Sequence, residues 1–140
     1  VPVLEKWQDI SGLWWQVMDR GGEGANYLET SASGMFVYFL LKMVRKKYCT
    51  NHDAIVAVSC SMKGYQALVS TRVVEDKSGE LHLEGICRGA GLGKSADANP
   101  YRNGSLDYYC TQEPVVRDNL QGVGPFILAS LEVEWKDSLH

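Results

Sequence analysis

Residues 30–47 read TSASGMFVYFLLKMVRKK, and this segment carries the clearest secondary-structure signal in the chain. Thr30 or Ser31 is suited to cap the first turn of a helix, because a hydroxyl can accept a hydrogen bond from a free backbone amide there. Three cations at residues 45–47 stand at the other end, where positive charge suits the helix dipole. We therefore predict a helix over Ser31–Lys47. Its apolar residues fall on every side, which indicates packing on more than one face.

A second helix is predicted over Asp53–Val69, after Thr50 or Asn51, with Asp53 placed as the acidic member of a capping box. Apolar residues follow the i, i+3, i+4, i+7 spacing of a single buried stripe: Ile55, Val58, Met62, Tyr65 and Val69. One stripe is typical of an outer helix in a helical protein.

A third helix is predicted over Pro125–Trp135, because proline is favoured at the first helical position and Gly124 precedes it. Its many apolar residues indicate that it is largely buried. Short strands are predicted within 13–18 and 81–87. The segment 85–124 is too long for an idle connection, and its tyrosines argue against disorder, so we expect it to be functional.

Composition bounds the possible functions. The chain has 140 residues, 45% hydrophobic and 22% charged, as expected of one globular domain. A net charge of −3 makes it a poor candidate for binding nucleic acid. No apolar run approaches the ~20 residues of a membrane helix, and no secretion signal pattern is present, so no compartment is assigned. Because the first residue is Val1 rather than Met, we expect a preceding segment.

Cysteine and histidine spacing predicts no metal site. The four cysteines are separated by 11, 27 and 23 residues, without a C-x-x-C pair, and we interpret them as small buried hydrophobic residues. His52 is placed at a helix start and His82 on the polar side of a strand, and neither has a neighbour in sequence that indicates a catalytic triad.

A glycine-rich segment, RGAGLGKS at residues 88–95, is similar to a Walker A phosphate loop. However, Arg88 stands where the first glycine of that motif belongs. The residues that follow, 96–104, contain Asn, Pro and Gly and cannot begin the helix that such a loop needs. Nucleotide binding is therefore disfavoured.

Aromatic residues in the loop-like segments point to carbohydrate. Flat rings at a cavity mouth suit sugar faces, and nearby polar side chains can bond hydroxyl groups. The alternative, which the sequence leaves open, is that these rings only pack the loops down. The aromatic residues concerned are Trp14, Trp15, Tyr27, Tyr101, Tyr108 and Tyr109, with Gln16, Glu29, Ser31 and Ser105 as the polar neighbours.

Five segments in order resemble the later part of the family 105 glycoside hydrolases, the unsaturated rhamnogalacturonyl hydrolases, which are related to the family 88 unsaturated glucuronyl hydrolases. They are GLWWQVMD at 12–19, YLETSASGMF at 27–36, GICRGAGLG at 85–93, YRNGS with YY at 101–109, and GVGPFILAS at 122–130. One departure is Asn103, where the family commonly has Asp.

The resemblance implies an all-α fold, part of an (α/α)6 toroid with a few short strands in its loops. It also implies hydration of the vinyl ether in a 4,5-unsaturated uronic acid residue, left on an oligosaccharide by a polysaccharide lyase, and no metal or organic cofactor. An Asp serves as general acid and base in this family, but it lies in the portion preceding these segments. We therefore expect residues 1–140 to be a single, incomplete C-terminal portion of the toroid, with no catalytic residue and no activity alone.

The residues expected near the mouth of the site, by this resemblance, are Trp14, Gln16, Glu29, Ser31, Ala90, Tyr101 and Ser105. For Glu29 and Ser31 the competing role is capping the helix that follows. The expected ligand is an oligosaccharide containing an unsaturated uronic acid. The missing helices of the toroid, or a second copy of the chain, are the expected protein partners. The alternative function is a noncatalytic helical module that binds carbohydrate or self-associates.

Overall fold

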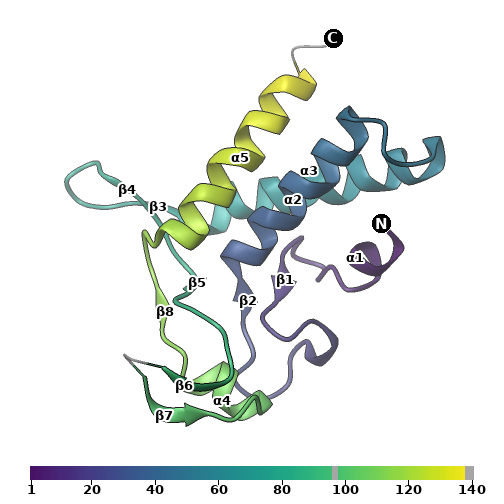
Figure 1. Ribbon diagram of the computed structural model, residues 1–140. Coiled ribbons are helices and arrows are strands. Elements are labelled where there is room, and N and C mark those ends of the chain that lie inside the picture. Colours follow the sequence, from purple (N-terminus) through teal and green to yellow (C-terminus); the bar gives the residue numbers. More distant parts are fainter. Residues whose placement is uncertain (96–97, 138–140) are drawn as a thin grey trace.

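Three long helices form the body of the protein in a computed structural model, which describes residues 1–95 and 98–137. They are α2 (Thr30–Arg45), α3 (Asn51–Arg72) and α5 (Leu120–Asp137). Helix α2 packs against both of the others, so it lies between α3 and α5 (Figure 1). The short helix α1 (Pro2–Lys6) packs against α3. No helix within the described ranges is long and apolar enough to cross a membrane.

Helix α2 confirms the predicted packing on more than one face. Val37 and Leu40 are fully buried between the neighbouring helices, whereas Met35 and Phe39 remain about half exposed. The predicted cap was wrong, because the N-cap is Glu29, whose carboxylate accepts hydrogen bonds from the amides of Ser31 and Ala32. The helix ends at Arg45, two residues earlier than predicted.

Helix α3 begins after Thr50, whose hydroxyl caps it by accepting from the Asp53 amide. The Asp53 carboxylate accepts from the Thr50 hydroxyl rather than from the backbone amide of a full capping box. The predicted stripe is only partly buried, because Ile55 is 72% exposed and Val69 44% exposed. The buried face instead consists of small residues and one leucine: Ala57, Cys60, Ser61, Gly64, Ala67 and Leu68. Small side chains let the N-terminal segment and α2 approach the helix closely.

Helix α5 begins five residues before the predicted start, so Pro125 lies inside it rather than at its first position. The prediction that this helix is largely buried was wrong. Only one face packs against α2, where Ala129 and Val133 are buried, while Ile127 and Leu131 are each 53% exposed. The far ends of the two helices are joined by an ion pair between Arg45 and Glu132, with N···O at 2.6 Å.

Short antiparallel strands lie at one end of the helices (Figure 1). They form the pairs β1 (Trp14–Trp15) with β2 (Leu28–Glu29), β3 (Val73–Glu75) with β4 (Leu81–Leu83), β5 (Ile86–Cys87) with β8 (Val115–Val116), and β6 (Gly93–Ser95) with β7 (Ala98–Arg102). The predicted strand over 81–87 is interrupted at Gly85, which adopts φ 77°. The fold is therefore mostly helical with short strands, as predicted.

The long segment 85–124 is structured within the described residues. Besides strands β5 to β8 it contains the short helix α4 (Leu106–Thr111) and the first turns of α5. Residues 93–95 of the Walker-like sequence form β6, so a strand stands where a phosphate loop would lead into a helix. The prediction against a Walker A loop agrees with this geometry.

Candidate functional site

A cleft of about 720 Å³ lies where three loop-rich segments meet. One wall is residues 16–20, which include the short 3-10 helix η1 (Met18–Arg20). The opposite wall consists of Ala90, Gly104, Leu106 and Tyr109, from the loop after β5 and the start of α4. Volumes of this size are typical of small-molecule sites. Two residues predicted near the site, Gln16 and Ala90, line the cleft.

Behind the cleft lies a network of buried polar groups centred on Glu29, which is 1% exposed. Besides capping α2, its Oε1 accepts a hydrogen bond of 2.8 Å from the amide of Cys87 in β5. The Cys87 thiol in turn accepts from Nε2 of Gln16 at 3.4 Å. Glu29 and Cys87 thereby link helix α2 and strand β5 to the wall of the cleft.

Glu29 and Ser31 take part in capping helix α2, which was the alternative to ligand contact for these two residues. The Ser31 hydroxyl donates to the Glu29 carboxylate at 2.9 Å, and the Ser31 amide donates to the same group. Glu29 is buried and neither residue lines the cleft, so both support it from behind.

Tyr27 adds a buried phenol to this network. Burial, followed by the neighbouring Cys87 thiol and the Glu29 charge, raises the pKa of the Tyr27 phenol far above its usual range. The group therefore stays protonated. Its hydroxyl oxygen has no hydrogen-bond partner in the described part of the chain, which leaves a donor and an acceptor unused beside Gln16 and Cys87.

Trp14 belongs to the hydrophobic core, and the structure does not support the predicted contact with a ligand. Its side chain is fully buried, and Nε1 donates to the Leu4 carbonyl at 2.8 Å. Its ring meets Phe36 edge to face, with centroids 5.3 Å apart. A sugar could not reach this ring without unfolding the surroundings.

The remaining predicted residues, Tyr101 and Ser105, belong to the opposite side of the site. Tyr101 is 63% exposed on β7 and does not line the cleft. Ser105 caps α4, its hydroxyl accepting from the Tyr108 amide at 3.1 Å, and it stands between two lining residues. The amide of Ser105 donates to Oδ1 of Asn103 at 2.8 Å. This turn needs only an oxygen acceptor, so Asn serves it as well as the Asp common in the family.

Some lining residues were not singled out from sequence. Met18 and Arg20 contribute to the wall that carries Gln16, and Arg20 also pairs with Glu23 at 3.2 Å on the surface. Tyr109, one of the wider aromatic candidates, fixes the facing loop because its hydroxyl donates to the Gly91 carbonyl at 2.6 Å. The sequence marked Arg20 by its position alone, because this residue directly follows the segment 12–19 that resembles the family.

His82 has close partners that its sequence neighbourhood did not indicate. Its Nδ1 lies 2.7 Å from Oδ2 of Asp118, and its Nε2 lies 3.4 Å from Oδ2 of Asp76. Both carboxylates raise the pKa of the His82 imidazole above its usual value, the Asp118 hydrogen bond most strongly. Asp118 is 36 positions away in sequence, so no local pattern could reveal the contact.

Comparison with known proteins identifies the class of this fold. A family 105 glycoside hydrolase from C. acetobutylicum superposes with a TM-score of 0.81 and 40% identity, over 95% of this chain and 35% of that one. A possible member of family 105 from Salmonella enterica gives a TM-score of 0.64 and 29% identity, over 96% and 30% of the two chains. The fold is thus a portion of an (α/α)6 glycoside hydrolase toroid.

The family model described as Glycosyl Hydrolase Family 88 matches residues 1–136. The chain belongs to glycosyl hydrolase family 88. Two curated relatives, Protein Atu3128 of Agrobacterium fabrum and the 24.9 kDa protein in the picA locus of Rhizobium radiobacter, are each 46% identical over 125 residues. These alignments cover 89% of this chain and 52% of each relative. The chain therefore spans about half the length of these relatives and about a third of the solved structures.

Proposed function

We propose that this chain supplies one side of the substrate cleft of an unsaturated uronyl hydrolase. The substrate is a lyase-generated oligosaccharide of the unsaturated rhamnogalacturonan type, and the reaction is hydration of the vinyl ether in its terminal 4,5-unsaturated uronic acid residue. Membership of family 88 and the likeness to family 105 structures support the glycosidase class.

The observation that carries the proposal is the composition of the cleft. Arg20 places a cation in the lining beside the Gln16 amide, next to the Asp19 carboxylate. Tyr109 adds a ring from α4. A guanidinium suits the carboxylate of a uronic acid, while the amide and ring suit hydroxyl groups and a sugar face. Catalytic protonation belongs to an Asp outside these residues, by resemblance to the family, so we propose that the 140-residue chain binds the sugar without converting it.

The test combines turnover and binding with an unsaturated uronyl disaccharide. Turnover removes the ultraviolet absorbance of the conjugated double bond, and we expect none from the purified chain. Binding, followed by NMR or calorimetry, should weaken about tenfold or more in Arg20→Gln, which corresponds to ~1.4 kcal/mol. Arg117→Gln removes the same charge from a residue outside the cleft lining and should bind as the wild type does.

Two outcomes would contradict this proposal. Clear turnover by the 140-residue chain would show that the catalytic group lies within it. Equal affinity of the Arg20 and Arg117 variants would show that the cleft is not the uronate site. The saturated disaccharide serves as the ligand control, since it lacks the planar double bond.

A second candidate is a self-associating noncatalytic module. It is favoured by the half-exposed apolar residues on α2 and α5.

A further inference from the structure

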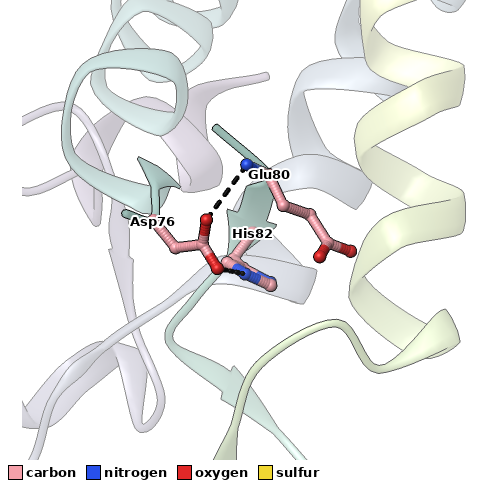
Figure 2. A group of neighbouring side chains, drawn as sticks. All are labelled: Asp76, Glu80 and His82. Carbon is pink, nitrogen blue, oxygen red and sulfur yellow. Dashed lines mark hydrogen bonds and ion pairs between the residues drawn. The ribbon is translucent and has the colours of Figure 1, made fainter. Parts of the chain in front are cut away.

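Three potential metal-binding side chains converge on the hairpin formed by β3 and β4, on a different part of the molecule from the cleft. Asp76 follows β3, Glu80 precedes β4, and His82 lies within β4. One ligand atom from each lies within 4.8 Å of the other two. Figure 2 shows the Asp76 carboxylate and the His82 ring facing each other, with the Glu80 side chain beside the ring.

The hairpin loop fixes the Asp76 carboxylate. Its Oδ1 accepts hydrogen bonds from the Ser78 amide at 2.7 Å, the Ser78 hydroxyl at 2.6 Å and the Glu80 amide at 3.0 Å. Because Oδ1 takes these donors, Oδ2 is the oxygen that faces His82. A ligand held in advance loses little freedom when an ion binds.

A residue from outside the hairpin orients the imidazole. Asp118, in the segment between β8 and α5, accepts from Nδ1 of His82 through Oδ2 at 2.7 Å and from the Leu83 amide through Oδ1 at 2.9 Å. Metal-binding histidines almost always donate their second ring nitrogen to such a carboxylate or carbonyl group. With Nδ1 engaged in this way, Nε2 is directed toward Asp76.

Nε2 of His82 and Oδ2 of Asp76 are spaced so that they could share one ion. The two atoms form a long hydrogen-bonded ion pair at 3.4 Å. Two ligands at ~2.0–2.1 Å from a tetrahedral zinc ion lie about 3.4 Å apart. The two fixed groups are therefore already spaced as one edge of such a tetrahedron. Glu80 is exposed, and a change of its side-chain rotamer brings its carboxylate closer to these two ligand atoms.

We propose that His82, Asp76 and Glu80 bind a divalent transition-metal ion, for which Zn²⁺ is the probe. One imidazole nitrogen with two carboxylate oxygens suits zinc and its neighbours, whereas Mg²⁺ and Ca²⁺ prefer ligand sets made of oxygen alone. Water completes the tetrahedron. The site lies on the β3–β4 hairpin, apart from α4 at the cleft (Figure 1). All three ligands belong to this hairpin, so the ion joins its two strands.

The experiment is a calorimetric titration of the full chain with Zn²⁺, with thermal unfolding measured in zinc and in chelator. We expect one equivalent to bind and to raise the melting temperature, because the ion binds the folded state preferentially. His82→Gln should abolish binding. Asp118→Asn, which leaves all three ligands in place, should weaken it about 10- to 100-fold. Mg²⁺ in excess should not compete.

Glu80→Gln provides the sharpest test, because its carboxylate makes no hydrogen bond or ion pair among the described contacts and its loss should leave the fold intact. We expect zinc affinity to fall about tenfold or more. Glu75→Gln, on the same hairpin but outside the cluster, removes the same charge and should bind zinc normally.

Replacing Zn²⁺ with Co²⁺ tests whether any of the four free cysteines is a ligand. We expect no thiolate charge-transfer band, because nitrogen and oxygen ligands do not give one. Absence of saturable binding, a thiolate band, or equal affinities of the Glu75 and Glu80 variants would overturn the proposal.

Discussion

Glu29 shows how one side chain holds the candidate site to the scaffold. Its carboxylate caps α2 and also accepts from the amide of Cys87, whose thiol holds the Gln16 side chain at the cleft wall. A buried carboxylate is tolerated because each oxygen is met by donors. The position of a cleft residue therefore depends on the first turn of a core helix.

Glu29→Ala removes the cap and leaves the buried Cys87 amide without a partner. A lost N-cap costs about 1 kcal/mol, and a buried unsatisfied donor costs about 1–3 kcal/mol. We expect the free energy of unfolding, measured by urea titration, to fall by about 2–4 kcal/mol. Glu23→Ala, at a carboxylate that is half exposed, is the control and should leave stability nearly unchanged. A loss no larger than that of the control would contradict the capping role.

Single residues near the cleft could be predicted only where a local pattern marked them. Gln16 and Ala90 were found because they lie within segments that resemble a family. Trp14 lies in such a segment too, but its burial depends on Phe36 and Leu4, which sequence spacing does not connect with it. The partners of His82 were missed for the same reason.

Close packing of small residues positions the helices. A Cβ atom on Gly64 would lie 3.0 Å from both the Trp14 ring and the Val37 side chain, closer than such atoms normally approach. On α5 a Cβ atom on Gly124 would meet nothing within 4 Å apart from its two chain neighbours. The two helical glycines therefore differ in how closely other elements pack against them.

Gly64→Val should destabilise the protein by about 1–3 kcal/mol, because the added carbons force apart a well-packed contact. Gly124→Ala should leave stability within about 1 kcal/mol of the wild type, because the lower backbone entropy of alanine is offset by contact of its Cβ with the ring of Pro125. Both effects can be measured as shifts of the urea midpoint at constant slope. If the urea midpoint of Gly64→Val is no lower than that of the wild type, the contact between α3 and β1 has room for the added carbons.

The three helices were predictable as elements because caps and apolar content are local properties. Thr50 with Asp53 marked the start of α3 correctly. The buried face of α3 was not predictable from hydrophobic periodicity, because alanine, glycine, serine and cysteine carry little of that signal. The start of α5 was missed because proline normally marks a first turn, whereas Pro125 lies in the second turn, where it removes one i→i−4 hydrogen bond.

At the scale of the whole molecule, the helical body leaves large apolar side chains exposed. Met35 and Phe39 are spaced by one turn on α2, and Ile127 and Leu131 are spaced by one turn on α5. Exposed apolar patches mark interfaces or aggregation sites. These residues favour the self-associating module as the second candidate function.

Self-association can be measured by light scattering after gel filtration at several concentrations. We expect the wild type to exceed the 15.6 kDa of the monomer, and Phe39→Ser combined with Leu131→Ser to shift it toward that mass. Tyr48→Ser, which removes an exposed aromatic outside the helices, should have no effect. A wild type that stays monomeric at every concentration would contradict this function.

Asn103 bears on the charge at the rim of the cleft. The turn before α4 takes an uncharged amide oxygen as its acceptor, in a position next to the lining residue Gly104. Compared with the Asp common in the family, the rim is less negative by one unit, while its shape is unchanged. A ligand that carries a carboxylate, as the proposed substrate does, is therefore repelled less on approach than at a rim with Asp.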